Sequence, residues 1–160
     1  MCALNGPAAG LGASVALLCD VIVMADSAVI IDPHVQVGLV AGDGGAAVWP
    51  LLLGPLAAKR HLMLGLPLTA DEAVRLGVAA EVCAVDDVPG VARTWADRLA
   101  AQAPLALQGT KVAVNAQLKQ ALLTSFDVST ALEMPCFLSA DHAEAVDAFV
   151  EKRRPTFHGR

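Results

Sequence analysis

The chain has 160 residues, of which 56% are hydrophobic and only 4% aromatic, and its formal net charge is −5. Such a chain is long and apolar enough to bury a sizeable core, which excludes general disorder. The acidic balance argues against nucleic-acid binding, which needs a basic face. The longest apolar run, residues 15–25, contains Asp20 and is too short to span a bilayer, so we expect no membrane segment.

The four cysteines are scattered along the chain without a CxxC pair. This spacing gives little support to a zinc site or a redox dithiol, so we expect no metal. Free thiols are typical of proteins in reducing compartments. We therefore expect a cytoplasmic protein, and no signal-peptide pattern opens the chain.

The first 55 residues predict α/β structure. Residues 6–20 combine a glycine-rich turn with a short apolar helix, and two apolar strands are predicted at 21–24 and 28–31. Residues 44–54 predict another short helix. Strands this apolar on both faces normally lie inside a larger sheet, so we expect them to need further partner strands.

From about residue 56 the pattern is mainly helical. A capping box at Thr69 and Glu72, with Gly77 as the stop, predicts one short helix. An edge strand is predicted at 78–85. Apolar spacing then predicts four helices at 88–102, 104–117, 119–138 and 140–153, with Ser139 and Asp141 beginning the last.

The segment "DPHVQVGLVAGDGG", residues 32–45, carries the clearest candidate chemistry. His34 and Asp43 are nine positions apart, and histidine is a competent acid–base group near neutral pH. Two simpler interpretations stay open: Asp43 could cap the helix that begins at Gly44, and His34 could be a partly buried residue bonded to the backbone. The remaining histidines are predicted to be surface residues: His61, His142 and His158.

Four stretches in order resemble the crotonase superfamily, also called the enoyl-CoA hydratase/isomerase family. They are "ALNGPAAGLGASVALLCDVIVMADSAVI", "PHVQVGLVAGDGGAAVWPLLLG", "LMLGLPLTADEAVRLGVAAEV" and "SADHAEAVDAFVEKRRPTF". The resemblance implies an α/β fold. Residues 1–55 would be the C-terminal part of a ββα spiral core, and residues 56–160 a helical trimerisation region. Family members extend further at the N-terminus, so the match covers their C-terminal portion.

The resemblance also implies a reaction type. Members of the family act on acyl-CoA thioesters and stabilise an enolate oxyanion with two backbone N–H groups. One of these amides corresponds to Leu11, where the family usually has glycine. The neighbouring Gly10 and Gly12 could equally serve only to turn a strand tightly into a helix. No tightly bound cofactor is implied, because coenzyme A is part of the substrate.

Two glutamates that activate water in the family's hydratases are replaced here by Ser14 and His34. Hydration by the two-glutamate mechanism is therefore not expected. The pairing of His34 with Asp43 resembles the family's carbon–carbon hydrolases, which cleave β-diketones by a retro-Claisen reaction. By the same resemblance Gly10, Ser14, Pro33 and Val37 are expected to line the substrate site.

Near the C-terminus, Phe149 and Lys152 match family positions that reach the coenzyme A of a neighbouring subunit. Their spacing suggests that they share one helix face, although Phe149 could be a core residue and Lys152 merely solvated. The resemblance implies a homotrimer or hexamer. A third possibility is a non-catalytic remnant that serves only as an oligomerisation module.

Overall fold

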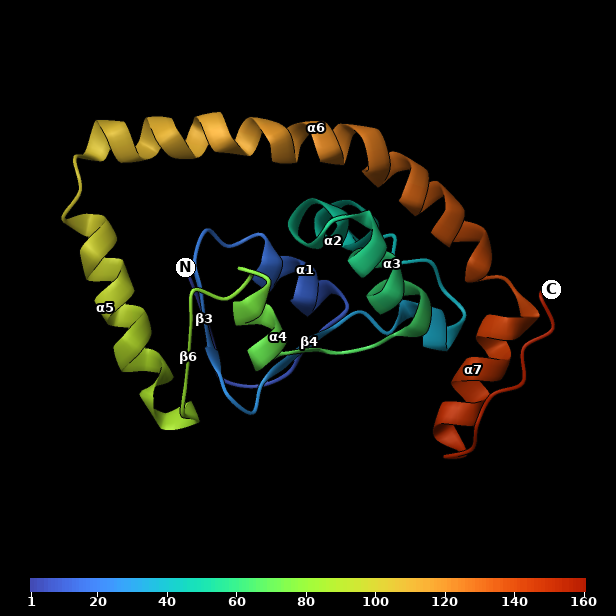
Figure 1. Ribbon diagram of the computed structural model, residues 1–160. Helices are drawn as coiled ribbons and strands as arrows, with labels where there is room; N and C mark the ends of the chain where they lie inside the picture. Colours follow the sequence, from blue (N-terminus) through green and yellow to red (C-terminus); the bar gives the residue numbers. More distant parts are fainter.

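The computed structural model describes residues 1–160, and two small sheets lie at its centre (Figure 1). The first sheet has the order β1-β3-β6 and is parallel throughout. Its strands are β1 (Cys2–Leu4), β3 (Ile22–Ala25) and β6 (Glu81–Cys83). β3 is the central strand of this sheet, and all four of its residues are buried. β6 lies at the edge, as predicted.

The second sheet has the order β2-β4-β5. It contains β2 (Ala8–Ala9), β4 (Val29–Ile31) and β5 (Leu68–Thr69). β2 is parallel to β4, and β5 is antiparallel to it. The two predicted apolar strands are thus confirmed, but they pair in different sheets, because the chain turns between Ala25 and Ala28.

Short helices follow the strands and cover the sheets: α1 (Leu11–Leu17), η1 (His34–Val37), α2 (Gly45–Leu53), α3 (Pro55–Leu64) and α4 (Ala70–Arg75). At the start of α4, the hydroxyl of Thr69 accepts a hydrogen bond from the Glu72 amide at 3.4 Å, which confirms the predicted N-cap. The Glu72 carboxylate bonds to Arg60 instead, so the capping box is only half formed.

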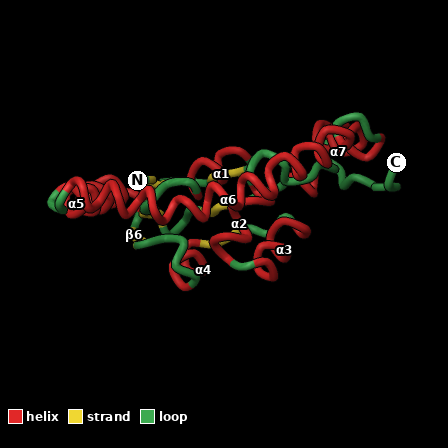
Figure 2. The backbone as a smooth tube through the Cα atoms, turned by 90° about the horizontal axis from the view of Figure 1, so that it is seen from above, coloured by secondary structure: helices red, strands yellow, loops and turns green.

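The C-terminal half consists of η2 (Val85–Asp87), α5 (Val88–Ala100), α6 (Pro104–Cys136) and α7 (Ala140–Val150). α6 runs as a long arch from α5 to α7 along one side of the sheets (Figures 1 and 2). The prediction of two helices, 104–117 and 119–138, was wrong. No glycine or proline stands near residue 118 to interrupt the helix, so it continues through that point.

The core is a cluster of 17 buried apolar residues around β3, with Trp49 and Met24 as its largest side chains. His61 packs against Trp49 with 5.5 Å between the ring centroids and is only 2% exposed. The prediction that His61 lies on the surface was therefore wrong. Its Nδ1 atom lies 3.0 Å from the carbonyl oxygen of Leu66, and this hydrogen bond makes burial tolerable.

The division at residue 55 into a core and a helical region stays a prediction. Two strands from beyond that point, β5 and β6, complete the two sheets. None of the helices combines the length and the apolar character that crossing a bilayer requires.

Candidate functional site

The structure brings the predicted oxyanion turn and the predicted histidine together. Gly10 connects β2 to α1 with φ +53°, and a β-carbon at this position would lie 3.6 Å from Cε1 of His34. The Gly10 amide donates to the carbonyl of Ile31 at 3.0 Å, which ties the turn to β4. Leu11 is the first residue of α1, so its amide has no acceptor within the helix. The His34 ring therefore lies beside the turn at Gly10, and the amide that follows this turn, that of Leu11, can donate a hydrogen bond to a ligand.

The orientation of His34 is set by Asp32, a residue that the sequence analysis did not single out. The ring Nδ1 lies 2.5 Å from Asp32 Oδ1, and the His34 amide donates to the same oxygen at 3.2 Å. The Asp32 side chain is only 1% exposed. Its hydrogen bond raises the pKa of His34, and the charges of Asp32, Asp43 and Glu133 act in the same direction against the effect of burial.

The opposite ring nitrogen of His34 faces two further carboxylates. Nε2 lies 3.6 Å from Asp43 Oδ2 and also 3.6 Å from Glu133 Oε1. Glu133 comes from α6 and its side chain is only 10% exposed. Burial raises the pKa of Glu133, and the neighbouring aspartates add to this, while His34 opposes it. We name these four residues, Asp32, His34, Asp43 and Glu133, the carboxylate–histidine cluster.

The glycines of the segment around Asp43 make room for this cluster. A β-carbon on Gly42 would collide with Glu133, whose own Cβ would lie 2.8 Å away. A β-carbon on Gly45 would collide with the Asp32 carboxylate. Gly44 has φ +119°, a conformation that L side chains rarely adopt. The repeated glycines are thus explained by close packing against polar side chains.

The interpretation of Asp43 as a helix cap was wrong. α2 begins at Gly45 with Gly44 as its N-cap residue, and no side chain caps it. The Asp43 Oδ1 atom is buried without a hydrogen-bond partner, while Oδ2 faces His34. The interpretation of His34 as a histidine bonded to the backbone was also wrong, because its ring contacts carboxylates.

Asp32, His34 and Asp43 each offer a ligand atom within 4.8 Å of the others, a spacing that can suit a cation. The contact of 2.5 Å between Asp32 and His34 is a hydrogen bond and leaves no room for an ion between those two groups. The arrangement is that of an acid–base group oriented by a carboxylate.

The other residues predicted for the substrate site lie around this cluster. The Ser14 hydroxyl is buried without a hydrogen-bond partner, and a β-carbon on Gly44 would lie 3.3 Å from it. Pro33 directly precedes η1, and Val37 ends it. The carbonyl of Val37 is engaged by His142. A role for Ser14, Pro33 and Val37 in binding substrate stays a prediction.

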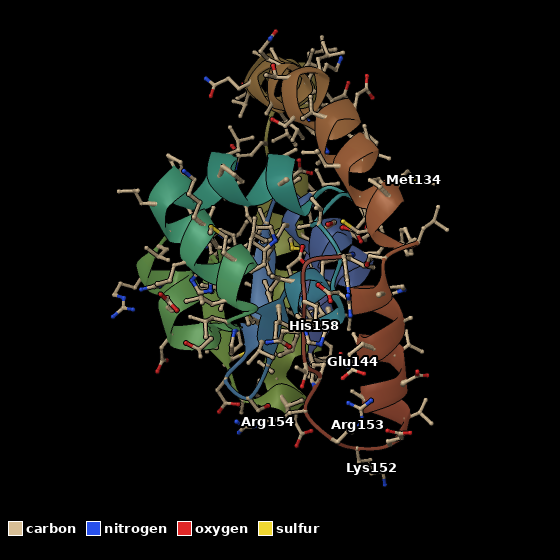
Figure 3. The ribbon with its side chains drawn as sticks, turned by 90° about the vertical axis from the view of Figure 1, so that its right-hand side faces the viewer. Met134, Glu144, Lys152, Arg153, Arg154 and His158 are labelled. Atoms are coloured by element: carbon tan, nitrogen blue, oxygen red, sulfur yellow. The ribbon has the colours of Figure 1, made fainter.

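Phe149 and Lys152 do not share a helix face. α7 ends at Val150, and Lys152 lies beyond it with φ +55°. Its side chain points away from the body at the far end of α7, whereas Arg153 turns back toward Glu144 (Figure 3). Phe149 is 81% exposed, so it is not a core residue. No contact joins either residue to His34, and their role at a neighbouring subunit stays a prediction.

Asp32 and Glu133 are the residues that sequence reasoning missed. Asp32 stands two positions before His34, within the quoted "DPH", and its place beside a proline and a histidine was an available signal. Glu133 lies in α6, far from His34 along the chain, and no motif in its surroundings marks it. Only the path of α6 across α2 brings it to the cluster.

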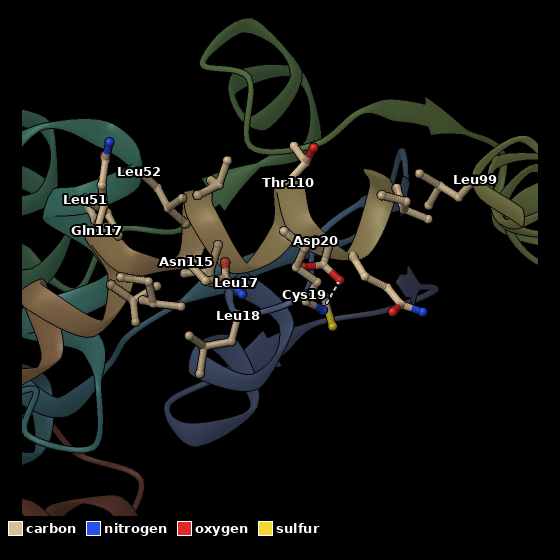
Figure 4. A pocket seen from close by; sticks show the side chains of 16 residues that line it. Leu17, Leu18, Cys19, Asp20, Leu51, Leu52, Leu99, Thr110, Asn115 and Gln117 are labelled. Carbon is tan, nitrogen blue, oxygen red and sulfur yellow. Dashed lines mark hydrogen bonds and ion pairs between the residues drawn. The ribbon is translucent and has the colours of Figure 1, made fainter. Parts of the chain in front are cut away.

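A separate cavity of about 560 Å³ lies beneath the first half of α6. Leucines from α1 and α2 line it (Figure 4). Lys111 and Asp20 also line it and form an ion pair 2.6 Å long. None of the four residues of the carboxylate–histidine cluster lines this cavity. The cavity is therefore distinct from the site at His34.

The sequence matches the family model described as enoyl-CoA hydratase/isomerase over residues 1–160. Similar curated proteins include 1,2-epoxyphenylacetyl-CoA isomerase of Escherichia coli, 33% identical, with 100% of this chain and 61% of that protein covered. Crotonyl-CoA hydratase of Syntrophomonas wolfei is 32% identical, with 97% and 60% covered.

Among solved structures, carnitinyl-CoA hydratase from Mycobacterium avium superposes with a TM-score of 0.91 at 31% identity, covering 99% of this chain and 62% of that one. The chain spans about three fifths of the length of the curated relatives it matches. With the family model matched from end to end and the fold shared at this identity, the chain belongs to the enoyl-CoA hydratase/isomerase family, within the crotonase superfamily.

Proposed function

We propose that this chain acts on acyl-CoA thioesters by stabilising an enolate oxyanion at the Leu11 amide and moving a proton through His34. The observation that carries the proposal is the position of the His34 ring beside Gly10, where a β-carbon would lie only 3.6 Å away. The relatives support the substrate class, because the curated names describe isomerases and hydratases of CoA esters.

The raised pKa of His34 suits proton transfer to and from carbon. A neutral imidazole with a raised pKa is a stronger base. His34 would take the proton from the carbon beside the thioester carbonyl and return it to the substrate. The Leu11 amide would donate to the enolate oxygen that forms between these two steps.

A carbon–carbon hydrolase that cleaves cyclic β-diketones is the second candidate, and Asp43 favours it. Its Oδ2 atom faces His34 Nε2 at 3.6 Å, and it does not cap α2. In such a reaction water adds to one carbonyl carbon and yields its proton to His34. The bond to the neighbouring carbon then breaks and its electron pair forms an enolate. His34 returns the proton to that carbon, and Asp43 balances the imidazolium charge.

We also propose that this chain assembles as a homotrimer or hexamer. Large apolar side chains along α6 and after it support self-association, since Leu105 is 87%, Leu123 79% and Leu138 91% exposed. The exposed ring of Phe149 is available for an adenine of a neighbouring subunit's substrate, with Lys152 for a phosphate. The four free thiols agree with a cytoplasmic location, which we also propose.

The test is hydrogen exchange at the carbon beside the carbonyl of butyryl-CoA, followed by NMR in D₂O. A second arm measures the cleavage of a cyclic β-diketone. A preorganised backbone donor at an oxyanion contributes about 10²–10³ in rate, so exchange above the rate without protein is expected. It should disappear in His34→Gln and persist in the control His158→Gln.

Cleavage of the diketone without exchange on the thioester would favour the carbon–carbon hydrolase. If neither substrate reacts while sedimentation shows a stable oligomer, the chain would be a non-catalytic oligomerisation module.

A further inference from the structure

The turn that carries His34 is held at its far end by α7. The ring of His142, in the first turn of α7, places Nδ1 2.7 Å from the carbonyl oxygen of Val37. A carbonyl can only accept, so Nδ1 carries the hydrogen and donates it. Val37 is the last residue of η1, and His34 is the first. One hydrogen bond from α7 therefore reaches the turn on which the candidate proton-transfer group lies.

The contact between α7 and η1 is close along the backbone as well. Gly38, the residue after η1, has φ +71°, and a β-carbon on it would lie 3.1 Å from the His142 amide nitrogen. The Leu39 amide donates to the His34 carbonyl at 2.9 Å, which closes the turn. Asp32 thus holds η1 where it begins, and His142 holds it where it ends.

The His142 ring is itself fixed by its surroundings. Phe137 meets it edge-on, with 5.4 Å between the ring centroids. The His142 amide donates to the hydroxyl of Ser139 at 3.0 Å. The Asp141 carboxylate accepts from the amides of His158 and Gly159, both at 2.7 Å, so the C-terminal tail folds back along the start of α7 (Figure 3). These contacts surround the residue that donates to Val37.

We propose that His142 is a positioning residue, which fixes the Val37 carbonyl and through it the orientation of the His34 imidazole within the carboxylate–histidine cluster. The effect of His142 on catalysis rests on the proposed function of His34. The orientation itself can be measured without turnover.

The experiment replaces His142 by asparagine and by leucine in the full chain. Asparagine places its side-chain nitrogen at the same bond distance from the backbone as Nδ1, so it can keep the hydrogen bond to Val37. Leucine has similar bulk but no donor. The control is His158→Leu, because the His158 side chain makes no hydrogen bond in the structure and the substitution keeps the amide that donates to Asp141.

The readout is the NMR titration of the His34 ring, assigned by its loss in His34→Gln. In His142→Leu the His34 pKa should fall toward its ordinary value, because a loosened ring loses contact with Asp32. It should return to the wild-type value in His142→Asn and stay there in the control. An unchanged His34 titration in a folded His142→Leu protein would overturn the proposal.

If the leucine variant does not fold, His142→Gln, which moves the donor by one bond, replaces it with the same expected shift. The exchange assay on the same variants separates the two ideas. A loss of about tenfold in kcat, with KM within about twofold, is expected if His34 moves protons, since small misplacements of a reacting group lower rates strongly. A shifted His34 titration without any exchange activity in the wild type would support the positioning role and reject the proposed reaction.

Discussion

Glu133 on α6 faces His34 on η1, with Oε1 3.6 Å from Nε2, although the two residues are far apart in the sequence. The Glu133 side chain fits only because Gly42 has no β-carbon. The long helix α6 therefore places a buried carboxylate in the candidate site. Four expected outcomes follow from this site and from the core beneath it.

Replacing Gly42 by alanine should displace Glu133 and lower the stability of the protein. The new β-carbon would lie 2.8 Å from the Glu133 Cβ, so the stem of the side chain and not only its flexible end must move. Overpacking of this kind costs roughly 1–3 kcal/mol, which urea unfolding can measure. The matched control is Gly109→Ala in α6, where no atom lies within 4 Å and alanine should be neutral or stabilising. Equal stability of the two variants would contradict the close packing of Glu133 against Gly42.

Asp43→Asn should lower the exchange or cleavage rate by about 10²-fold if Asp43 supports acid–base chemistry at His34. The melting temperature should change little, because Asp43 caps no helix. The double variant with His34→Ala should be hardly worse than the slower single variant, since groups that act as one unit are not additive. Full activity combined with reduced thermal stability would instead assign Asp43 a structural role.

The stability of the folded chain should decrease as the pH rises above the ordinary histidine pKa of about 6.5. The folded-state pKa of His34 is raised, so the folded protein binds more protons than the unfolded chain above the ordinary histidine pKa of about 6.5. The contribution of His34 is therefore complete below that pH and is lost as the pH passes its folded-state pKa.

Glu133 also makes the folded chain less stable as the pH rises, but this effect begins at a lower pH than that of His34. The reason is that the pKa of Glu133 is likewise raised above its ordinary value. Urea unfolding at several pH values measures the slope. The slope should become shallower in His34→Gln, whereas His158→Gln should leave it unchanged. A slope that is the same in His34→Gln and in the wild type would show that the His34 ring is not held by Asp32.

His61→Ala should be among the most destabilising single substitutions, at roughly 2–4 kcal/mol. The side chain is 2% exposed, contacts Trp49 and satisfies the Leu66 carbonyl, so alanine would leave both a void and an unpaired acceptor. His158→Ala, in the exposed tail, is the comparison and should change stability by less than about 0.5 kcal/mol. Similar melting temperatures for the two variants would show that His61 is not buried.

The sequence by itself determined the elements that depend on local signals. The hydroxyl of Thr69 caps α4 and that of Ser139 caps α7, because an N-cap needs only a side-chain oxygen within reach of an amide three residues on. The apolar runs gave the strands β3 and β4, since their burial follows from composition alone. The family resemblance, carried by four ordered stretches, identified the fold and indicated His34 and Asp43 as a pair of candidate site residues.

The tertiary structure decided what depends on contacts between distant segments. α6 continues through residue 118 as one helix, and local apolar spacing did not predict this. The burial of His61 depended on Trp49 from a different helix, and the third carboxylate at His34 depended on the path of α6 over α2. The carbonyl that His142 holds belongs to a turn far away in the chain. Such pairs leave no periodic or spacing signal in one sequence, because the free energy that joins them arises only when packing brings their atoms within a few ångströms.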